Sequence, residues 1–355
     1  MTSFENSSRS RWGTWLRALT MTTGLAAAAA SSGATAAEVN VYSYREPQLV
    51  EPLLKSFTEQ TGIKARLVFA KDGLVERMAA EGRLSPADVL LTTDIARLTE
   101  AKALDLTAAY TGPDRERVAA QLRDADGHWM ALTMRARVLY VSKERVKETA
   151  ISYTELADPK WKGRICSRSG QHPYNTALIA SMIAHLGEAG AEAWLKGVKA
   201  NLAHRPAGGD REQVRDVWSG QCDIALGNTY YMGLMLTNEK SPEQKKWANA
   251  VRVIFPDAGG RGTHVNISGI AIARHAPHKA EAEKLVAFLL SDNAQSLYAG
   301  TNHEYPVART VPPSELLQSL GQLKPDALPL GEISRLRKKA SELVDKVNFD
   351  AGPSS

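Results

Sequence analysis

Two adjacent phenols follow what reads as a buried strand. The sequence GNTYY occupies residues 227–231, directly after a predicted strand at 222–226, so Tyr230 and Tyr231 fall where a strand passes into a loop or a helix. Neighbouring side chains point apart in a strand, but at a helix start both can turn toward one centre. Phenolate oxygens are hard donors that suit hard cations. Half-buried aromatic packing is the common alternative, and the pair alone favours that alternative.

A third tyrosine and two arginines occupy comparable places. Tyr174 lies in QHPYN at 171–175, at a predicted helix start, where free backbone N–H groups favour an anion or an ionised side chain. Arg135 and Arg137 are two residues apart in a predicted strand, so they share one face. Packing is again the alternative for Tyr174, and a salt-bridged surface strand is the expected setting for Arg137.

The first part of the chain alternates strand and helix patterns. Stretches rich in apolar residues at 39–43, 65–69 and 87–91 read as strands, and between them residues 47–62 and 74–81 have apolar positions at helical spacing. This order predicts an α/β protein with a mostly parallel sheet flanked by helices. Ligands bind such sheets beyond the carboxyl ends of the strands, which places 44–46 and 92–94 at one rim.

The second part of the chain has the same alternation of strand and helix patterns, and no low-complexity linker separates the two parts. Strands are expected at 164–167 and 224–226, with helices at 174–186, 191–200 and 213–220. Residues 129–141 form a predicted strand long enough to cross between two lobes, and 253–272 provides a return path. A charged helical tail is expected at 316–347. The chain therefore reads as two closely joined lobes.

The N-terminus is typical of an exported protein. Arg9, Arg11 and Arg17 form a basic region, and the stretch from Leu16 to Ala30 is mostly apolar or small with no charge after Arg17. Small residues then end near Ala36 or Ala37, which predicts a signal peptide over 1–37. This stretch is too short and too rich in Ala, Thr and Ser for a membrane span. The expected location is a bacterial periplasm. In that oxidising compartment Cys166 and Cys222 could pair, but the sequence leaves the pairing open.

Composition excludes several functions. The 355 residues carry 44 basic and 39 acidic side chains, a net +5, and no cluster of five or six Lys/Arg indicates nucleic acid. Two cysteines cannot supply a four-thiolate zinc or iron–sulfur site. No HExxH or GxSxG motif positions a catalytic group, so an enzyme is the weakest interpretation.

Six motifs taken together resemble the periplasmic ferric-iron-binding proteins of bacterial ABC importers. They are VYSYR at 41–45, SPADV at 85–89, RARV at 135–138, WKGRI at 161–165, NTYY at 228–231 and EYP at 304–306. The resemblance runs from Val39 to about Val307. It implies the two-lobed type II periplasmic binding-protein fold and a transferrin-like iron site.

Carried over by position, the resemblance assigns roles to five residues. Tyr230 and Tyr231 match the family's paired iron ligands, and Tyr174 matches the third tyrosine of a three-tyrosine subgroup. Arg135 matches the arginine that binds a synergistic anion such as carbonate, and Asn228 lies near that anion. Tyr44 and Arg45 are expected on the facing lobe, where they could hydrogen-bond the anion or a phenolate; Arg45 could instead pair with a carboxylate on its own rim.

The sequence departs from the histidine-containing members of this family. Glu46 and Thr93 stand where some members place histidine and glutamate ligands, so a three-phenolate site fits better. Three phenolates neutralise Fe³⁺, and a bidentate carbonate brings the donors to five of the six that an octahedron needs. Water or Glu46 would supply the sixth, and a role for Glu46 outside the coordination sphere is the alternative.

The resemblance also implies an organisation and partners. We expect lobe 1 to comprise 38–135 plus 262–312 and lobe 2 to comprise 136–261 plus 313–355, with closure hinged on the crossing strands. The expected protein is a monomeric carrier, not an enzyme, that delivers Fe³⁺ to an inner-membrane ABC permease. A carrier of the same fold for a polyamine, thiamine or an oxyanion is the alternative.

Overall fold

The computed structural model describes residues 37–353, and the predicted signal peptide lies almost wholly outside them. The strands are β1 (Glu38–Ser43), β2 (Lys64–Phe69), β3 (Val89–Thr92), β4 (Thr107–Ala108), β5 (Met130–Ser142), β6 (Ile165–Cys166), β7 (Ile224–Asn228), β8 (Val251–Ile254), β9 (Val265–Ala273) and β10 (Tyr305–Pro306). The α-helices are α1 (Pro47–Thr61), α2 (Leu74–Glu81), α3 (Ile95–Ala103), α4 (Pro173–Ala200), α5 (Asp210–Trp218), α6 (Thr229–Leu236), α7 (Pro242–Asn249), α8 (Lys279–Leu289), α9 (Asp292–Asn302), α10 (Glu315–Ser319) and α11 (Leu330–Val347). Strands and helices alternate along the chain, which confirms the predicted α/β class.

The first group of strands has the order β2-β1-β3-β9. β1 pairs in parallel with both β2 and β3, as the alternating pattern predicts, whereas β9 is antiparallel to β3. Helix α1 begins at Pro47 and ends at Thr61, and it is capped by Gly62, whose φ of 72° suits glycine. Its apolar stripe of Val50, Leu53, Leu54 and Phe57 is buried. This packing fixes the loop that follows β1.

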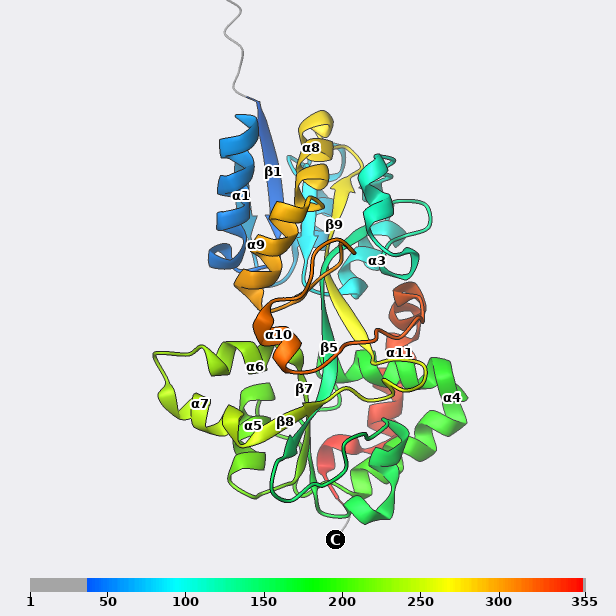
Figure 1. The fold of residues 1–355 in the computed structure, drawn as a ribbon. Helices are drawn as coiled ribbons and strands as arrows, with labels where there is room; N and C mark the ends of the chain where they lie inside the picture. The colour runs from blue at the N-terminus through cyan, green and yellow to red at the C-terminus, as the bar shows by residue number, and fades with distance from the viewer. Residues whose placement is uncertain (1–36, 354–355) are drawn as a thin grey trace, which may run out of the picture. The chain divides into compact units, whose positions relative to one another are not determined.

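The long strand β5 joins both groups of strands. Met130–Ala136 pair antiparallel with β9, while Arg137–Ser142 pair with β7 and β8, so β5 passes from one part of the sheet to the other. In Figure 1 β5 runs beside β9 through the centre of the described chain. The crossing strand predicted at 129–141 is confirmed. The return path predicted at 253–272 is two strands, β8 and β9, with a loop between them.

The second group contains β6 and β7, which are parallel, and the helices that carry the tyrosines. The two helices predicted at 174–186 and 191–200 are merged in α4, but Gly187 has φ 72° and breaks the helical geometry. Helix α11 packs along α4 (Figure 1). The predicted tail helix begins later than expected, because Pro325 and Pro329 lie between α10 and α11. The lobe boundaries themselves stay a prediction.

Cys166 and Cys222 form a disulfide that closes a loop with a sequence separation of 56 residues. Pairing of β6 with β7 makes this possible, since the strand pair places Cys166 beside the start of β7. Among the described residues no helix is long and apolar enough to cross a membrane.

Candidate metal centre

The paired tyrosines lie in the first turn of a helix. β7 is buried throughout and ends at Asn228, after which α6 begins at Thr229. Tyr230 and Tyr231 therefore turn to the same side, and their ring centroids are 4.3 Å apart. This is the geometry that the helix-start interpretation of the sequence anticipated.

Tyr174 reaches the same place from α4. Pro173 occupies the first helical position, and His172 caps the helix by accepting a hydrogen bond at Nδ1 from the Tyr174 backbone N–H at 3.2 Å. The hydroxyl oxygens of Tyr174 and Tyr230 are 3.0 Å apart. The structure thus brings together three tyrosines that are as many as 57 positions apart in the chain.

The environment of these phenols disfavours ionisation without a cation. Burial raises the pKa of Tyr230 well above that of an ordinary phenol, and Tyr174 and Tyr231 add to the rise. Burial, followed by Tyr174 and Asp210, also raises the pKa of Tyr231. Phenolates would form here only when a bound cation compensates for their mutual repulsion.

Guanidinium groups surround the phenols. The guanidinium carbon of Arg168 is 5.3 Å from the centroid of the Tyr174 ring, and those of Arg135 and Arg137 are each 5.9 Å away. Arg211 is 5.1 Å from the Tyr231 ring centroid. This positive field favours the anionic form of any oxygen placed among these side chains.

Asp210 organises this group. Its carboxylate accepts hydrogen bonds from Arg137 Nη1 at 2.6 Å, Arg168 Nη1 at 3.0 Å and the Asn228 backbone N–H at 2.8 Å. Asp210 is 1% exposed and starts α5, where the helix dipole also favours its charge. Sequence reasoning missed this residue because its partners lie 18 to 73 positions away. Its place in the first turn of a helix was the only available signal.

Arg137 corrects an expectation. It was expected on a salt-bridged surface strand, but it is 2% exposed and its Nη2 also donates to Asn175 Oδ1 at 2.8 Å. The reason is that β5 is an interior strand at this point, paired on β7. Asn228 accepts from Arg137 through Oδ1 at 3.2 Å, which fixes the side chain of Asn228 beside the tyrosines.

Arg135 leaves one donor free. Its Nη2 donates to the backbone oxygen of Thr93, while Nη1 is buried and has no hydrogen-bond partner among the described residues. A cavity of about 10 Å³ adjoins it, which holds about one water-sized group. The cavity is lined by Arg135, Arg137, Tyr174, Asn228, His264 and Asn266. An unpaired buried guanidinium N–H beside a polar cavity is suited to an anion.

Two histidines near this cavity are uncharged at neutral pH. Burial, reinforced by Arg137 and Arg337, lowers the pKa of His264 to about 3. Burial, reinforced by Arg168 and Arg137, lowers the pKa of His172 to about 4. The positive field that the phenols experience therefore comes from arginines and not from imidazolium groups.

Tyr44 and Arg45, in the loop after β1, interact with residues other than the three tyrosines. Tyr44 accepts a hydrogen bond at its hydroxyl from the Val75 backbone N–H at 2.9 Å, and its ring lies under Arg97. Arg45 pairs with the buried carboxylate of Glu304 at 3.0 Å, which matches the alternative stated for it. Burial lowers the pKa of Arg45, but Glu304, Tyr298 and Tyr230 outweigh it and raise the pKa overall. Arg45 is thus within electrostatic reach of Tyr230.

Glu46 and Thr93 occupy different settings. Glu46 is exposed, precedes α1 and accepts a hydrogen bond from Gln48 Nε2. Thr93 contacts the site through its backbone oxygen, which accepts a hydrogen bond from Arg135. Asp94, which follows it, caps α3 and pairs with Arg337 at 2.7 Å. The structure does not give Glu46 a hydrogen bond to any of the three tyrosines.

The family model described as "Bacterial extracellular solute-binding protein" matches residues 85–322. The chain belongs to this family. Iron uptake protein A1 of Synechocystis sp. is 42% identical to this solute-binding protein over 315 residues, which cover 88% of the chain and 87% of the relative. Members of this family bind solutes, which agrees with the expectation of a binding function.

Two solved structures support the fold assignment. The Bordetella ferric binding protein is 53% identical with a TM-score of 0.85, and the alignment covers 88% of this chain and 99% of the other. The Trichodesmium protein IdiA (FutA), in complex with iron and citrate ligands, is 37% identical with a TM-score of 0.85 at the same coverage. This likeness confirms the type II fold that the sequence resemblance implied.

Proposed function

We propose that this solute-binding protein captures Fe³⁺ through the phenolates of Tyr174, Tyr230 and Tyr231 and delivers it to an ABC permease. The observation that carries the proposal is the convergence of the three phenols, with 3.0 Å between the Tyr174 and Tyr230 oxygens. The proteins named above are an iron uptake protein, a ferric binding protein and a protein in complex with iron and citrate, which supports iron as the cargo.

The charges of the site suit a trivalent ion. Fe³⁺ is a hard cation that prefers anionic oxygen donors, and three phenolates cancel its charge. Burial raises the pKa of Tyr230 and of Tyr231, so both bind as phenolates only by releasing protons. Iron affinity should therefore rise with pH, because each proton released contributes up to about tenfold per pH unit.

A synergistic anion would complete the coordination. We assign it to the position beside the free Nη1 of Arg135, close to Asn228. Because the adjoining cavity holds only about one water-sized group, the anion would extend from it toward the tyrosines. Carbonate fits the charge and supplies two oxygens. Citrate accompanies iron in the Trichodesmium structure, so carboxylate-bearing anions are a second class to test. Water or Glu46 would provide the remaining donor.

The protein acts as a carrier in the periplasm and not as an enzyme. The N-terminal export signal and the family of extracellular solute-binding proteins support this location. We propose that it works as a monomer whose cargo passes to the permease of an ABC importer. The lobe boundaries stated from the sequence are part of this proposal.

The other cargoes named from the sequence suit the site less well. A polyamine needs free carboxylates, but Asp210 is already saturated by two arginines and a backbone N–H. An oxyanion would suit the arginines but would leave the three phenols without a role. Thiamine carries a single positive charge, which could not balance three phenolates as a trivalent ion does.

Absorption spectroscopy tests the proposal. Ferric loading should give a visible phenolate-to-iron charge-transfer band, which should disappear in the double variant Tyr230→Phe/Tyr231→Phe. Tyr305→Phe is a matched control, because the Tyr305 hydroxyl is also buried but has no hydrogen-bond partner in the described chain. A colourless ferric-loaded protein, or an unchanged band in the double variant, would reject the site.

A second variant examines the sixth donor. Glu46→Gln should keep most of the visible band and iron capacity if Glu46 lies outside the coordination sphere, since its side chain is exposed. Complete loss of iron in this variant would instead place Glu46 on the metal.

A further inference from the structure

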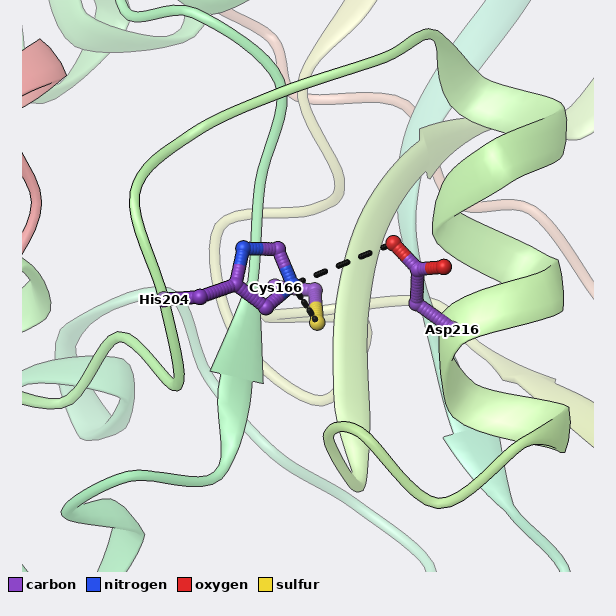
Figure 2. Close-up of side chains that lie close together, drawn as sticks. All are labelled: Cys166, His204 and Asp216. Atoms are coloured by element: carbon purple, nitrogen blue, oxygen red, sulfur yellow. Dashed lines mark hydrogen bonds and ion pairs between the residues drawn. The ribbon is translucent and has the colours of Figure 1, made fainter.

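A second group of potential metal ligands lies away from the tyrosines. Cys166 ends β6, His204 is in the loop after α4, and Asp216 is on α5. Figure 2 shows the three side chains converging, with dashed lines from the His204 ring to the Cys166 sulfur and to the Asp216 carboxylate. Cys222, bonded to Cys166, adds a second sulfur at the same point. Nothing in the iron site uses these four residues.

The spacing of these atoms suits a tetrahedral ion. Cys166 Sγ is 3.3 Å from His204 Nε2, and His204 Nε2 is 3.8 Å from Asp216 Oδ2. One ligand atom from each of the three residues lies within 4.8 Å of the others. Ligands about 2.0–2.3 Å from a tetrahedral zinc ion are about 3.3–3.8 Å apart. Little movement is needed to place an ion among them.

Neighbouring groups orient two of the candidate ligands, His204 and Asp216. His204 Nδ1 is 2.8 Å from the Arg205 backbone oxygen, so a neutral ring donates there and leaves the Nε2 lone pair toward Cys166. Asp216 is 4% exposed, and its Oδ1 accepts hydrogen bonds from Arg215 while Oδ2 faces His204. His204 keeps 32% of its side chain exposed, which gives an ion a route in.

We propose that reduction of the Cys166–Cys222 disulfide opens a Cys₂HisAsp site for a zinc-class divalent cation. A dithiol reductant would supply two electrons and two protons to the disulfide, becoming a disulfide itself, and the cation would then displace both thiol protons. Two thiolates and one carboxylate give the bound ion a net charge of −1, which Arg215 offsets. Disulfide formation and metal capture therefore compete for the same sulfur atoms.

The donor set separates this site from the iron centre. Thiolate and imidazole ligands select zinc-class ions, whereas three phenolates select a hard trivalent ion. The newly exported chain, before oxidation, is the form in which the second site exists. Zinc would hold that form reduced and delay closure of the disulfide.

Cobalt(II) absorption tests the proposal, because tetrahedral cobalt with thiolate ligands gives intense visible and near-ultraviolet bands. The full chain is reduced with a trialkylphosphine, which takes oxygen from water to form the phosphine oxide, and two thiols are confirmed by titration. One equivalent of cobalt should give the bands, and zinc should remove them. The oxidised protein is the matched control, since it keeps the tyrosine site but has no thiolates.

Variants assign the ligands. His204→Ala and Asp216→Asn should each weaken cobalt binding at least tenfold, whereas His275→Ala, which removes an exposed histidine elsewhere, should not. If the buried disulfide resists the phosphine, Cys222→Ser provides Cys166 as a free thiol beside His204 and Asp216 and should still bind cobalt. Absence of thiolate–cobalt bands in both the reduced chain and Cys222→Ser would overturn the proposal.

A kinetic measurement gives the functional consequence. One equivalent of zinc should slow oxidation of the reduced chain by oxidised glutathione at least tenfold, and His204→Ala should remove most of that protection. Equal oxidation rates with and without zinc would also overturn the proposal.

Discussion

Asp210 places a single buried negative charge between Arg137 and Arg168, and both arginines face Tyr174. The carboxylate therefore sets where the positive charges around the phenols lie. Because the same carboxylate accepts the backbone N–H of Asn228, it also fixes the end of β7 from which Tyr230 and Tyr231 follow. Asp210 therefore links the arginines to α6, the helix that carries Tyr230 and Tyr231.

Replacement of Asp210 tests this role. Asp210→Asn should lower the free energy of unfolding by about 3–5 kcal/mol, because it leaves buried guanidinium groups without their counter-charge. It should also weaken iron binding. Urea unfolding and ferric titration measure both effects.

Asp72→Asn is the control, since the Asp72 side chain is 86% exposed and should affect neither measurement. An Asp210→Asn protein with wild-type stability would show that the buried ion pairs do not hold the site together.

At the scale of elements, α11 ties the tyrosine helix α4 to α3. Arg337 on α11 pairs with Asp94, which caps α3, and donates to the Pro173 backbone oxygen at 2.9 Å. Burial raises the pKa of Asp94, but Arg337 and Arg135 outweigh it and hold that pKa below its usual range. The start of α4, and so Tyr174, is held from outside its own helix.

Arg337→Gln should cost about 1.5–3 kcal/mol of unfolding free energy at pH 7, the range for hydrogen bonds to charged groups. The lowered pKa of Asp94 contributes stability that is present above the unfolded value of about 3.9 and is lost as pH falls through the folded value. The difference between wild type and variant should therefore shrink in acid.

Denaturant titrations from pH 7 to pH 3 check this prediction. Arg335→Gln on the same helix is the matched control, because Arg335 is exposed and should show no measurable change. A pH-independent difference for Arg337→Gln would contradict the role given to Asp94.

Elements of the site differ in how far the sequence predicts them. The position of Tyr230 and Tyr231 follows from a buried strand and the helix after it, and the place of Tyr174 follows from Pro173 at a helix start. The Arg137–Asp210 pair does not follow, because it joins β5 to α5 across 73 positions and no local pattern records that contact. For the same reason the sequence did not decide whether Cys166 and Cys222 pair, because their bond depends on the pairing of β6 with β7.

Across the described molecule, the helix that carries the paired tyrosines meets the end of α9. A methyl group at Gly233 of α6 would lie 2.6 Å from both Cβ and Cγ of His303, which caps α9. These atoms are close to the His303 backbone, so they cannot simply rotate away. In the proposed lobe division α6 belongs to lobe 2 and α9 to lobe 1, which makes Gly233 a contact between lobes.

Gly233→Ala should act as a wedge. Iron-loaded Gly233→Ala should have a larger radius of gyration by small-angle X-ray scattering than iron-loaded wild type, and it should release iron faster. In a helix alanine is ordinarily about 1 kcal/mol more stable than glycine. Faster iron release from Gly233→Ala would therefore come from the clash with His303 and not from a weakened helix.

Gly300→Ala is the matched control, because Gly300 is also helical and a methyl group there meets nothing within 4 Å. It should keep the wild-type radius and iron retention. Identical scattering for Gly233→Ala and wild type would show that closure does not bring α6 against α9.

A crystal structure of the iron-loaded protein tests the central claim most directly. We predict one ferric ion bonded to the phenolate oxygens of Tyr174, Tyr230 and Tyr231, with an anion between the ion and Arg135. An ion bound at any other place, or bound with one of these three oxygens uncoordinated, would contradict the account.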